Sequence, residues 1–387
     1  MKIAIDIRHL ATPHLSGVGR YTVELINHMA QSAPEDVFFL FAAGSLKTLA
    51  NLPDFDAPNV RVTKKRMSNR LLYALLRSPS GKHLEDFLPE VPDVWLFPNI
   101  NILRTKLPYA MTVHDVSFLL YPEFFTRKDR AWYRVAGAEK LIKRAASSFA
   151  VSDRTKNDLI EYVGVNKDRV HVTPLGVGDV YHEKELPSDR SYLTSHKIRF
   201  PYFLTLSTLE PRKNLESVVE AYSTWRARDL LGVKPHLVIA GGRGWKTSGL
   251  DQIIERSAFK NDIHLIGYVP EAHKPALYRH AEALIFPSFY EGFGLPPLEA
   301  SRCGTPIIAS FSASLPEVLG DGAIYVDPYN VTDLVQAIEV VMNTKLNKKV
   351  HLCPDRDISE PHHMTDKRFS WLQTAKKTLN ALHQIRG

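Results

Sequence analysis

The segment PSFYEGFGLPPLEA, residues 287–300, carries two glutamates eight positions apart, Glu291 and Glu299. Glycines after the first glutamate permit a bend, and the Pro-Pro pair suits the first turn of a helix. The spacing therefore predicts Glu291 in a loop and Glu299 about one turn into the following helix. In an open α/β sheet, ligands bind where such loops leave the carboxyl ends of the strands. Carboxylates placed there would accept hydrogen bonds from sugar hydroxyls.

A pair of adjacent cations stands in TLEPRKN, residues 208–214, between an apolar run and a helical segment. Arg212 and Lys213 at the start of a helix form a compact site of the kind that binds a diphosphate. A pair of solvated charges is the alternative interpretation.

A third segment, SGVGRY at residues 16–21, lies between the first apolar run and the first helical segment. Gly17 and Gly19 allow a ligand to approach the backbone, and the amides of an opening helix favour an anion. A tight turn without a ligand would need the same glycines.

The elements that must position these residues are strands and helices in alternation. The strand-like runs are apolar throughout, which is typical of parallel strands covered on both faces. They are residues 2–7, 37–42, 60–63, 93–98, 109–115, 148–152, 170–176, 202–207, 236–242, 263–268, 283–288, 306–310 and 323–327. Helical patterns separate them, at 17–31, 130–145, 153–163, 214–230, 271–281 and 331–343. This alternation predicts an α/β fold with parallel sheets.

The polar stretch 178–200 has no clear period and is the predicted domain boundary. We expect two Rossmann-like domains, 1–182 and 183–367. A last helix, 368–387, is expected to pack back towards the N-terminal domain, since one helical face gathers its apolar residues. These are Phe369, Leu372, Ala375, Leu379 and Leu382.

Composition excludes several classes of protein. The 387 residues have 44% hydrophobic and 24% charged side chains, which rules out a disordered or collagen-like chain. No apolar run approaches about 18 residues, and the two cysteines fit a reducing cytoplasm. The dinucleotide motif GxGxxG, the P-loop, HExxH and GxSxG are all missing from the sequence.

The net charge of +7 is concentrated in one stretch without acidic residues, between Asp56 and Glu85. Its apolar residues, from Met67 to Leu76, predict an amphipathic helix. One interpretation is a solvated basic surface whose apolar side faces its own core. Another is a patch on anionic lipid headgroups, formed by Lys64, Lys65, Arg66 and Arg70. Nucleic acid is a third, but no nucleic-acid module accompanies the stretch.

Taken together, these motifs resemble family four of the retaining, nucleotide-sugar-dependent glycosyltransferases. Glu291 and Glu299 match its E-x₇-E motif, and further motifs follow in the family's order. These are SGVGRY (16–21), VHD (113–115), PLGV (174–177), RKN (212–214) and ASLPEV (313–318). The resemblance implies a GT-B fold, in which two Rossmann-like domains face each other across the active-site cleft. The N-terminal domain would bind the acceptor and the C-terminal domain the nucleotide sugar.

The resemblance also implies roles for single residues. Arg212 and Lys213 would neutralise the diphosphate, Glu299 would bind the ribose, and Glu291 would hold the donor sugar. His114, with Asp115 behind it, would lie near the donor sugar on the acceptor side. Catalysis would rest on His114, Glu291, Arg212 and Lys213. The donor site would comprise Gly17, Ser207, Arg212, Lys213, Tyr268, Val269, Glu291, Phe293, Gly294, Leu295 and Glu299.

No metal or other cofactor is expected, since the two cations would replace the divalent ion that other sugar transferases use. The implied reaction retains the anomeric configuration by same-face attack. Glu291 acting as a covalent nucleophile is the alternative. Two segments depart from the family: the first loop reads SGVG where many members have consecutive glycines, and residues 345–367 are irregular.

Within the family, the chain resembles mannosyltransferases that use GDP-mannose. The expected acceptor is a glycan or lipid-linked oligosaccharide of a bacterial surface polysaccharide such as lipopolysaccharide. The expected location is the cytoplasm, on the inner face of the membrane if the basic patch binds lipid. Alternatives are a UDP-sugar donor, a sugar synthase with a soluble acceptor, an epimerase, or a basic binding protein without catalysis. Nucleic acid is not an expected partner.

Overall fold

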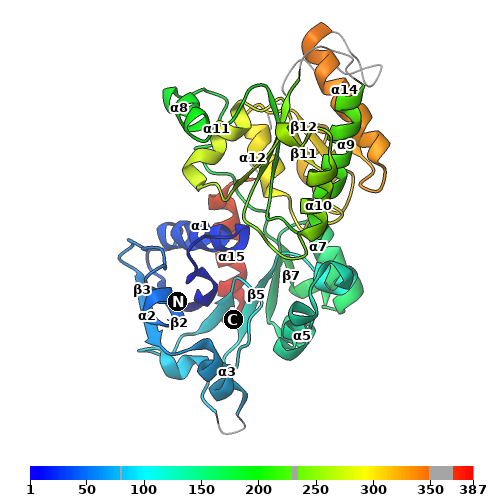
Figure 1. The fold of residues 1–387 in the computed structure, drawn as a ribbon. Helices are drawn as coiled ribbons and strands as arrows, with labels where there is room; N and C mark the ends of the chain where they lie inside the picture. The colour runs from blue at the N-terminus through cyan, green and yellow to red at the C-terminus, as the bar shows by residue number, and fades with distance from the viewer. Residues whose placement is uncertain (79–80, 229–233, 348–368, 387) are drawn as a thin grey trace. The chain divides into compact units, whose positions relative to one another are not determined.

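The computed structural model describes residues 1–78, 81–228, 234–347 and 369–386 (Figure 1). The chain forms two compact units. Met1–Pro122, Arg127–Gly176 and the C-terminal helix make the first unit, and Val177–Asp366 with Glu123–Thr126 makes the second. The irregular segment 345–367 lies outside the described residues, except for the three that end a helix.

The first unit contains a seven-stranded sheet in the order β3-β2-β1-β4-β5-β6-β7, with every pair parallel. Five of its strands are β1 (Lys2–Asp6), β2 (Val37–Gly44), β4 (Val94–Phe97), β5 (Tyr109–Val113) and β6 (Ser147–Ala150), and almost all their residues are buried. The edges are β3 (Val60–Arg66) and β7 (Val170–Val172). Burial on both faces explains why these strands are apolar throughout.

The helices of the first unit are α1 (Gly17–Ser32), α2 (Leu46–Leu49), α3 (Asn69–Arg77), α4 (Ser117–Leu120), α5 (Arg127–Ala136), α6 (Ala138–Arg144), α7 (Asp153–Asp158) and α15 (Trp371–Arg386). The last helix, red in Figure 1, packs against α1. Its buried face includes Ala375, Leu379 and Leu382, as predicted, but Leu372 is exposed and Trp371 is buried in its place.

The second unit contains a six-stranded parallel sheet in the order β10-β9-β8-β11-β12-β13. Its strands are β8 (Tyr202–Leu206), β9 (His236–Ala240), β10 (Ile263–Gly267), β11 (Leu284–Phe286), β12 (Ile307–Ser310) and β13 (Ile324–Val326). Its helices are α8 (Pro187–Ser195), α9 (Leu215–Ala227), α10 (Ser248–Arg256), α11 (Lys274–Arg279), α12 (Leu295–Arg302), α13 (Leu315–Leu319) and α14 (Val331–Asn347). Apolar residues of α9, α14 and the sheet form one buried core.

The thirteen predicted strands are confirmed, but several helix predictions are wrong in detail. The pattern over 130–145 is two helices, because Gly137 adopts a left-handed conformation with φ of +69° between them. The stretch 178–200, expected to be irregular, contains α8. In the basic stretch, β3 extends to Arg66 and the helix begins only at Asn69. Leu72 and Leu76 of that helix point into the core.

The division between the units falls between Gly176 and Val177, before the expected boundary at 182/183. Contacts of the intervening residues explain the difference. Tyr181 donates a hydrogen bond to Glu271, and Arg279 donates one to the backbone carbonyl of His182 at 3.1 Å. Glu123–Thr126 join the second unit similarly, since the Trp245 indole N–H donates to the Phe124 carbonyl at 2.7 Å.

Candidate active site

The loop after β11 carries Glu291 to the start of α12, as the sequence predicts. Gly294 precedes the helix with φ of +96°, and Pro296 and Pro297 occupy its first turn. The Ser314 hydroxyl donates to the backbone carbonyl of Glu291 at 2.9 Å, so the backbone of the loop is held from the side of α13. The loop is therefore a fixed support for the Glu291 carboxylate.

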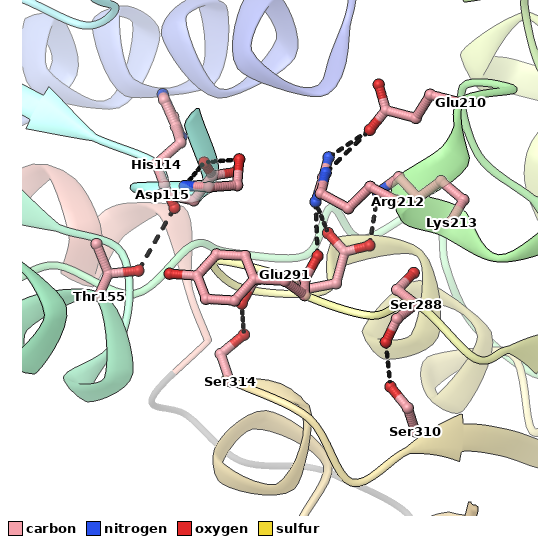
Figure 2. Close-up of polar contacts among 12 residues, drawn as sticks. His114, Asp115, Thr155, Glu210, Arg212, Lys213, Ser288, Glu291, Ser310 and Ser314 are labelled. Carbon is pink, nitrogen blue, oxygen red and sulfur yellow. Dashed lines mark hydrogen bonds and ion pairs between the residues drawn. The ribbon is translucent and has the colours of Figure 1, made fainter. Parts of the chain in front are cut away.

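Arg212 and Lys213 both bind Glu291. The Lys213 ammonium lies 2.6 Å from Glu291 Oε1, and the Arg212 guanidinium lies 3.0 Å from Oε2. Arg212 also donates from Nε and Nη2 to Glu210 Oε1, at 3.0 and 2.7 Å. Figure 2 shows the guanidinium between the two carboxylates. The structure thus brings three of the predicted catalytic side chains into one ion-pair cluster.

Charge in this cluster is balanced, with two cations facing two carboxylates. Burial opposes ionisation of Glu291, but Lys213 and Arg212 outweigh it and lower the pKa of the Glu291 carboxyl to about 2. Glu291 is therefore ionised throughout the physiological range and acts as a hydrogen-bond acceptor. An ionised carboxylate is also what a covalent nucleophile would require, so this pKa does not separate the two mechanisms considered.

Glu299 lies in the first turns of α12, where the sequence places it, and only 1% of its surface is exposed. Its Oε2 accepts a hydrogen bond from the Tyr278 hydroxyl at 2.9 Å. Burial is the main cause of a strongly raised pKa for Tyr278, so this phenol remains a donor. Tyr278 was not among the predicted residues, and it fixes the carboxylate expected to bind the ribose.

The other donor-site residues predicted in this unit follow strands or open α12. Ser207 comes directly after β8, and its buried hydroxyl has no hydrogen-bond partner among the described residues. Tyr268 and Val269 follow β10, the first exposed and the second buried. Phe293 is buried before α12, and Leu295 begins the helix. Carboxyl ends of parallel strands share one edge of a sheet, so these residues lie at the edge where α/β proteins bind ligands.

Gly17, His114 and Asp115 belong to the first unit. His114 Nε2 lies 2.9 Å from the Pro98 carbonyl, and its ring meets Tyr21 edge-to-face with centroids 4.8 Å apart. Burial lowers the pKa of His114, so the imidazole is neutral near pH 7. Because a carbonyl can only accept, Nε2 carries the proton and Nδ1 is left as an acceptor.

The remaining two residues of this unit have different surroundings. Asp115 accepts from the backbone N–H and the hydroxyl of Ser117, at 2.9 and 2.5 Å, at the start of α4. Gly17 is the first residue of α1, and a side chain there would meet nothing within 4 Å. Packing within the first unit therefore does not explain why residue 17 is a glycine. Its expected position over a phosphate stays a prediction.

Sequence reasoning missed two residues that hold the cluster in place. Glu210 binds Arg212 at 2.7 Å and directly precedes the turn of Pro211–Lys213 that carries both cations. Asn214 adopts a left-handed conformation with φ of +56°, and its buried amide donates to the carbonyls of Pro287 and Pro328 at 3.2 and 2.7 Å. The sequence offered one signal for Asn214, because it directly follows the two cations in the RKN motif.

Replacing Gly294 by alanine is expected to lower the free energy of unfolding by roughly 2–4 kcal/mol. The left-handed backbone disfavours a side chain, and the added Cβ would lie 2.5 Å from a methyl carbon of Leu315. Denaturant unfolding measures the change. Gly320→Ala is the matched control, since its φ is also positive but the space is open. Equal losses in the two variants would contradict the steric argument.

Comparison with known proteins identifies the family. The family model "Glycosyltransferase Family 4" matches residues 15–179, and the model "Glycosyl transferases group 1" matches residues 194–352. The chain belongs to family 4 of the glycosyltransferases. Like its relatives, this glycosyltransferase has the GT-B fold: it aligns with HepE of Anabaena, solved with UDP and glucose, at a TM-score of 0.70. The two share 18% identity, and the match covers 99% of this chain and 100% of HepE.

Among curated relatives, the glycosyltransferase is 29% identical to the O-antigen chain mannosyltransferase B of Escherichia coli. That match covers 98% of this chain and 99% of the relative. It is also 30% identical to the serotype-specific mannosyltransferase WbdA of Escherichia coli, over 95% of this chain. The chain spans only 44% of the length of WbdA.

Proposed function

We propose that this glycosyltransferase transfers mannose from GDP-mannose, with retention, to a glycan or lipid-linked acceptor of a bacterial surface polysaccharide. The ion-pair cluster of Arg212, Lys213 and Glu291 carries the proposal, because it combines cations for a diphosphate with a carboxylate for sugar hydroxyls. The similarity to O-antigen mannosyltransferases supports mannose as the sugar and a surface polysaccharide as the product.

The chemistry follows from the charges. Cleavage of the sugar–diphosphate bond leaves negative charge on the β-phosphate, and fixed cations stabilise that charge as it develops. Lys213 and Arg212 supply these cations here, so we propose a reaction that needs no divalent metal. Glu291 holds both cations in place and accepts hydrogen bonds from the donor sugar. The leaving phosphate then receives the proton of the acceptor hydroxyl in a same-face attack.

A thermal-shift panel tests the proposal, with GDP, GDP-mannose, UDP, UDP-glucose and UDP-N-acetylglucosamine, each with and without EDTA. A ligand that binds the native state raises the melting temperature. We expect shifts with GDP and GDP-mannose that EDTA does not change. Shifts with UDP compounds alone would mean that the donor is a UDP-sugar and not GDP-mannose. Loss of the shift in EDTA would contradict metal independence. No shift with any nucleotide would favour a binding protein without catalysis.

We also propose that the enzyme acts at the cytoplasmic face of the membrane, where lipid-linked acceptors are presented. No helix among the described residues is long and apolar enough to span a membrane. Lys64, Arg66 and Arg70 are exposed on β3 and α3, and Leu71 beside them is also exposed. Cationic side chains next to exposed apolar area suit an anionic lipid surface. The buried Leu72 and Leu76 restrict this contact to the outer side of α3.

Neutralising Lys64, Lys65, Arg66 and Arg70 together is expected to reduce binding to vesicles that contain anionic lipid, by about 1 kcal/mol per charge at most. Cosedimentation with phosphatidylserine vesicles measures the change, and hydrolysis of the donor sugar should be unaltered. The matched control is a quadruple variant in which Lys143, Lys156, Lys167 and Arg169 are neutralised instead. It has the same net charge as the patch variant but leaves the patch intact. Unchanged vesicle binding in the patch variant would reject the lipid surface.

A further inference from the structure

Tyr278 of α11 connects two helices of the second unit at two points. Its hydroxyl donates to Glu299 Oε2 of α12 at 2.9 Å. Its backbone carbonyl accepts a hydrogen bond at 2.7 Å from the hydroxyl of Thr305, which follows α12. Tyr278 itself is fully buried. The phenol therefore has a fixed position relative to the carboxylate that is expected to bind the ribose.

The next residue, Arg279, holds the same helix from another side. Its guanidinium donates to both oxygens of Asp189 in α8, at 2.7 and 2.8 Å, and only 4% of each of the two side chains is exposed. It also binds the carbonyl of His182. Successive residues of a helix point in directions about 100° apart, so α11 is held by α8 and by α12 at once. Breaking a buried ion pair is costly, and Tyr278 is therefore kept against Glu299.

The orientation of a glutamate carboxylate depends on its partners, because the terminal torsion of glutamate has a broad distribution of angles. Glu299 is only 1% exposed, so solvent does little to orient it. The hydrogen bond from Tyr278 fixes Oε2 and with it the plane of the carboxylate. The 2′ and 3′ hydroxyls of a ribose are adjacent, and a carboxylate accepts hydrogen bonds from both only when its plane is turned towards them.

The phenol orients Glu299 without neutralising it. Burial, and after it the charge of Glu299, raises the pKa of Tyr278 well above its usual range, so the phenol keeps its proton. Glu291 differs, since Lys213 and Arg212 bind its two oxygens and balance its charge. Hydrogen bonds to an ionised acceptor are stronger than those between neutral groups. A carboxylate oriented by a phenol is therefore suited to bind hydroxyls.

We infer that Tyr278 is a positioning residue that makes the enzyme select ribose over deoxyribose in its donor nucleotide, by orienting Glu299 towards the 2′ and 3′ hydroxyls. The inference rests on the proposed function and goes further, because it assigns this selectivity to a buried residue outside the group expected to contact the ligand. A site that hydrogen-bonds a hydroxyl discriminates against an analogue without it, since a group of the site is then left unpaired. Loss of the phenol should therefore weaken the hydroxyl contacts alone.

Calorimetry on the full chain tests the inference, with GDP, 2′-deoxy-GDP and 3′-deoxy-GDP and with the corresponding UDP series. We expect the parent to bind the ribonucleotide about tenfold more tightly than either deoxy form. Tyr278→Phe should bind the ribonucleotide about tenfold more weakly and the deoxy forms with nearly unchanged affinity, so that the three become similar. A general disturbance of the fold would instead weaken all three nucleotides alike.

Tyr202→Phe is the matched control. Tyr202 is as fully buried as Tyr278, and its hydroxyl also donates to α11, to the carbonyl of Leu277 at 2.8 Å. We expect this variant to have a lower melting temperature and an unchanged preference for the ribonucleotide. Glu299→Gln should lose the preference by itself. Adding Tyr278→Phe to that variant should change the preference no further, because Tyr278 acts through Glu299.

Three results would overturn the inference: equal binding of ribo- and deoxynucleotides by the parent, an undiminished preference in Tyr278→Phe, or the same loss of preference in Tyr202→Phe. The first needs only the parent protein and so does not depend on the folding of a variant. If UDP binds and GDP does not, the proposed base is wrong and the UDP series tests Tyr278. If neither nucleotide binds the parent, the proposed function is wrong, and the inference falls with it.

Discussion

Glu291→Gln is expected to lower turnover roughly 10²-fold and, at the same time, to tighten the binding of GDP. The parent cluster has two cations and two carboxylates, so removing one negative charge leaves it with a net charge of +1 beside the diphosphate. Repulsion from Glu291 disappears, and affinity for GDP should rise roughly tenfold, or about 1.4 kcal/mol. Turnover falls because glutamine holds Lys213 and the donor sugar less firmly. Calorimetry with GDP and initial rates with GDP-mannose measure the two effects.

Glu210→Gln is the matched control for Glu291→Gln. It removes the same charge from Arg212 but leaves Lys213 bound to Glu291. We expect tighter GDP binding with a much smaller loss of turnover. Turnover of Glu291→Gln within threefold of the parent would reject a role for this carboxylate in positioning the cations and the sugar. A sugar found covalently attached to Glu291 in the parent enzyme, by mass spectrometry, would instead support the nucleophilic mechanism.

Lys213→Met is expected to reduce turnover by roughly 10²–10³-fold, since it removes a fixed cation from the leaving phosphate. It should also change how stability depends on pH. In the parent, the pKa of Glu291 is lowered to about 2, so its contribution to stability is present above pH 4.5 and is lost as pH falls towards 2. Without Lys213, burial raises this pKa again. The contribution, about 3 kcal/mol in the parent, should then largely disappear.

The difference in melting temperature between the parent and Lys213→Met should therefore widen from pH 3.5 to pH 6. Lys260→Met is the matched control, because Lys260 pairs with Glu255 at an exposed site, where such pairs contribute little. A constant difference across this pH range would mean that Lys213 does not determine the ionisation of Glu291. Turnover within tenfold of the parent would remove Lys213 from the catalytic group.

The sheets were predictable because their strands are buried on both faces, which makes each strand a continuous apolar run. The positions of Glu291 and Glu299 were predictable for a local reason: glycine and tandem proline determine where α12 begins. Helix continuity was harder to predict. Gly137 separates α5 from α6 by its left-handed conformation, while the flanking residues keep a helical composition.

Side-chain partners from distant segments were beyond prediction. Tyr278 reaches Glu299 from another helix, and Asn214 reaches Pro328 across more than a hundred residues. Trp245 likewise donates to the carbonyl of Phe124 across more than a hundred residues. Hydrophobic periodicity describes one helix or strand at a time, so it carries no information on side-chain contacts between distant segments.

The return of α15 to the first unit has a consequence for synthesis of the chain. Thr374 donates to the carbonyl of Pro174, and His383 lies 2.7 Å from Asp36, so segments of this unit lack these partners until residues that follow the second unit have been translated. A ribosome releases the whole second unit before α15 emerges. The second unit can therefore complete its core during translation, whereas the first keeps one side of α1 uncovered until α15 has been translated. For the same reason, a gene cut at residue 177 would yield an incomplete N-terminal half unless the sequence of α15 were supplied with it.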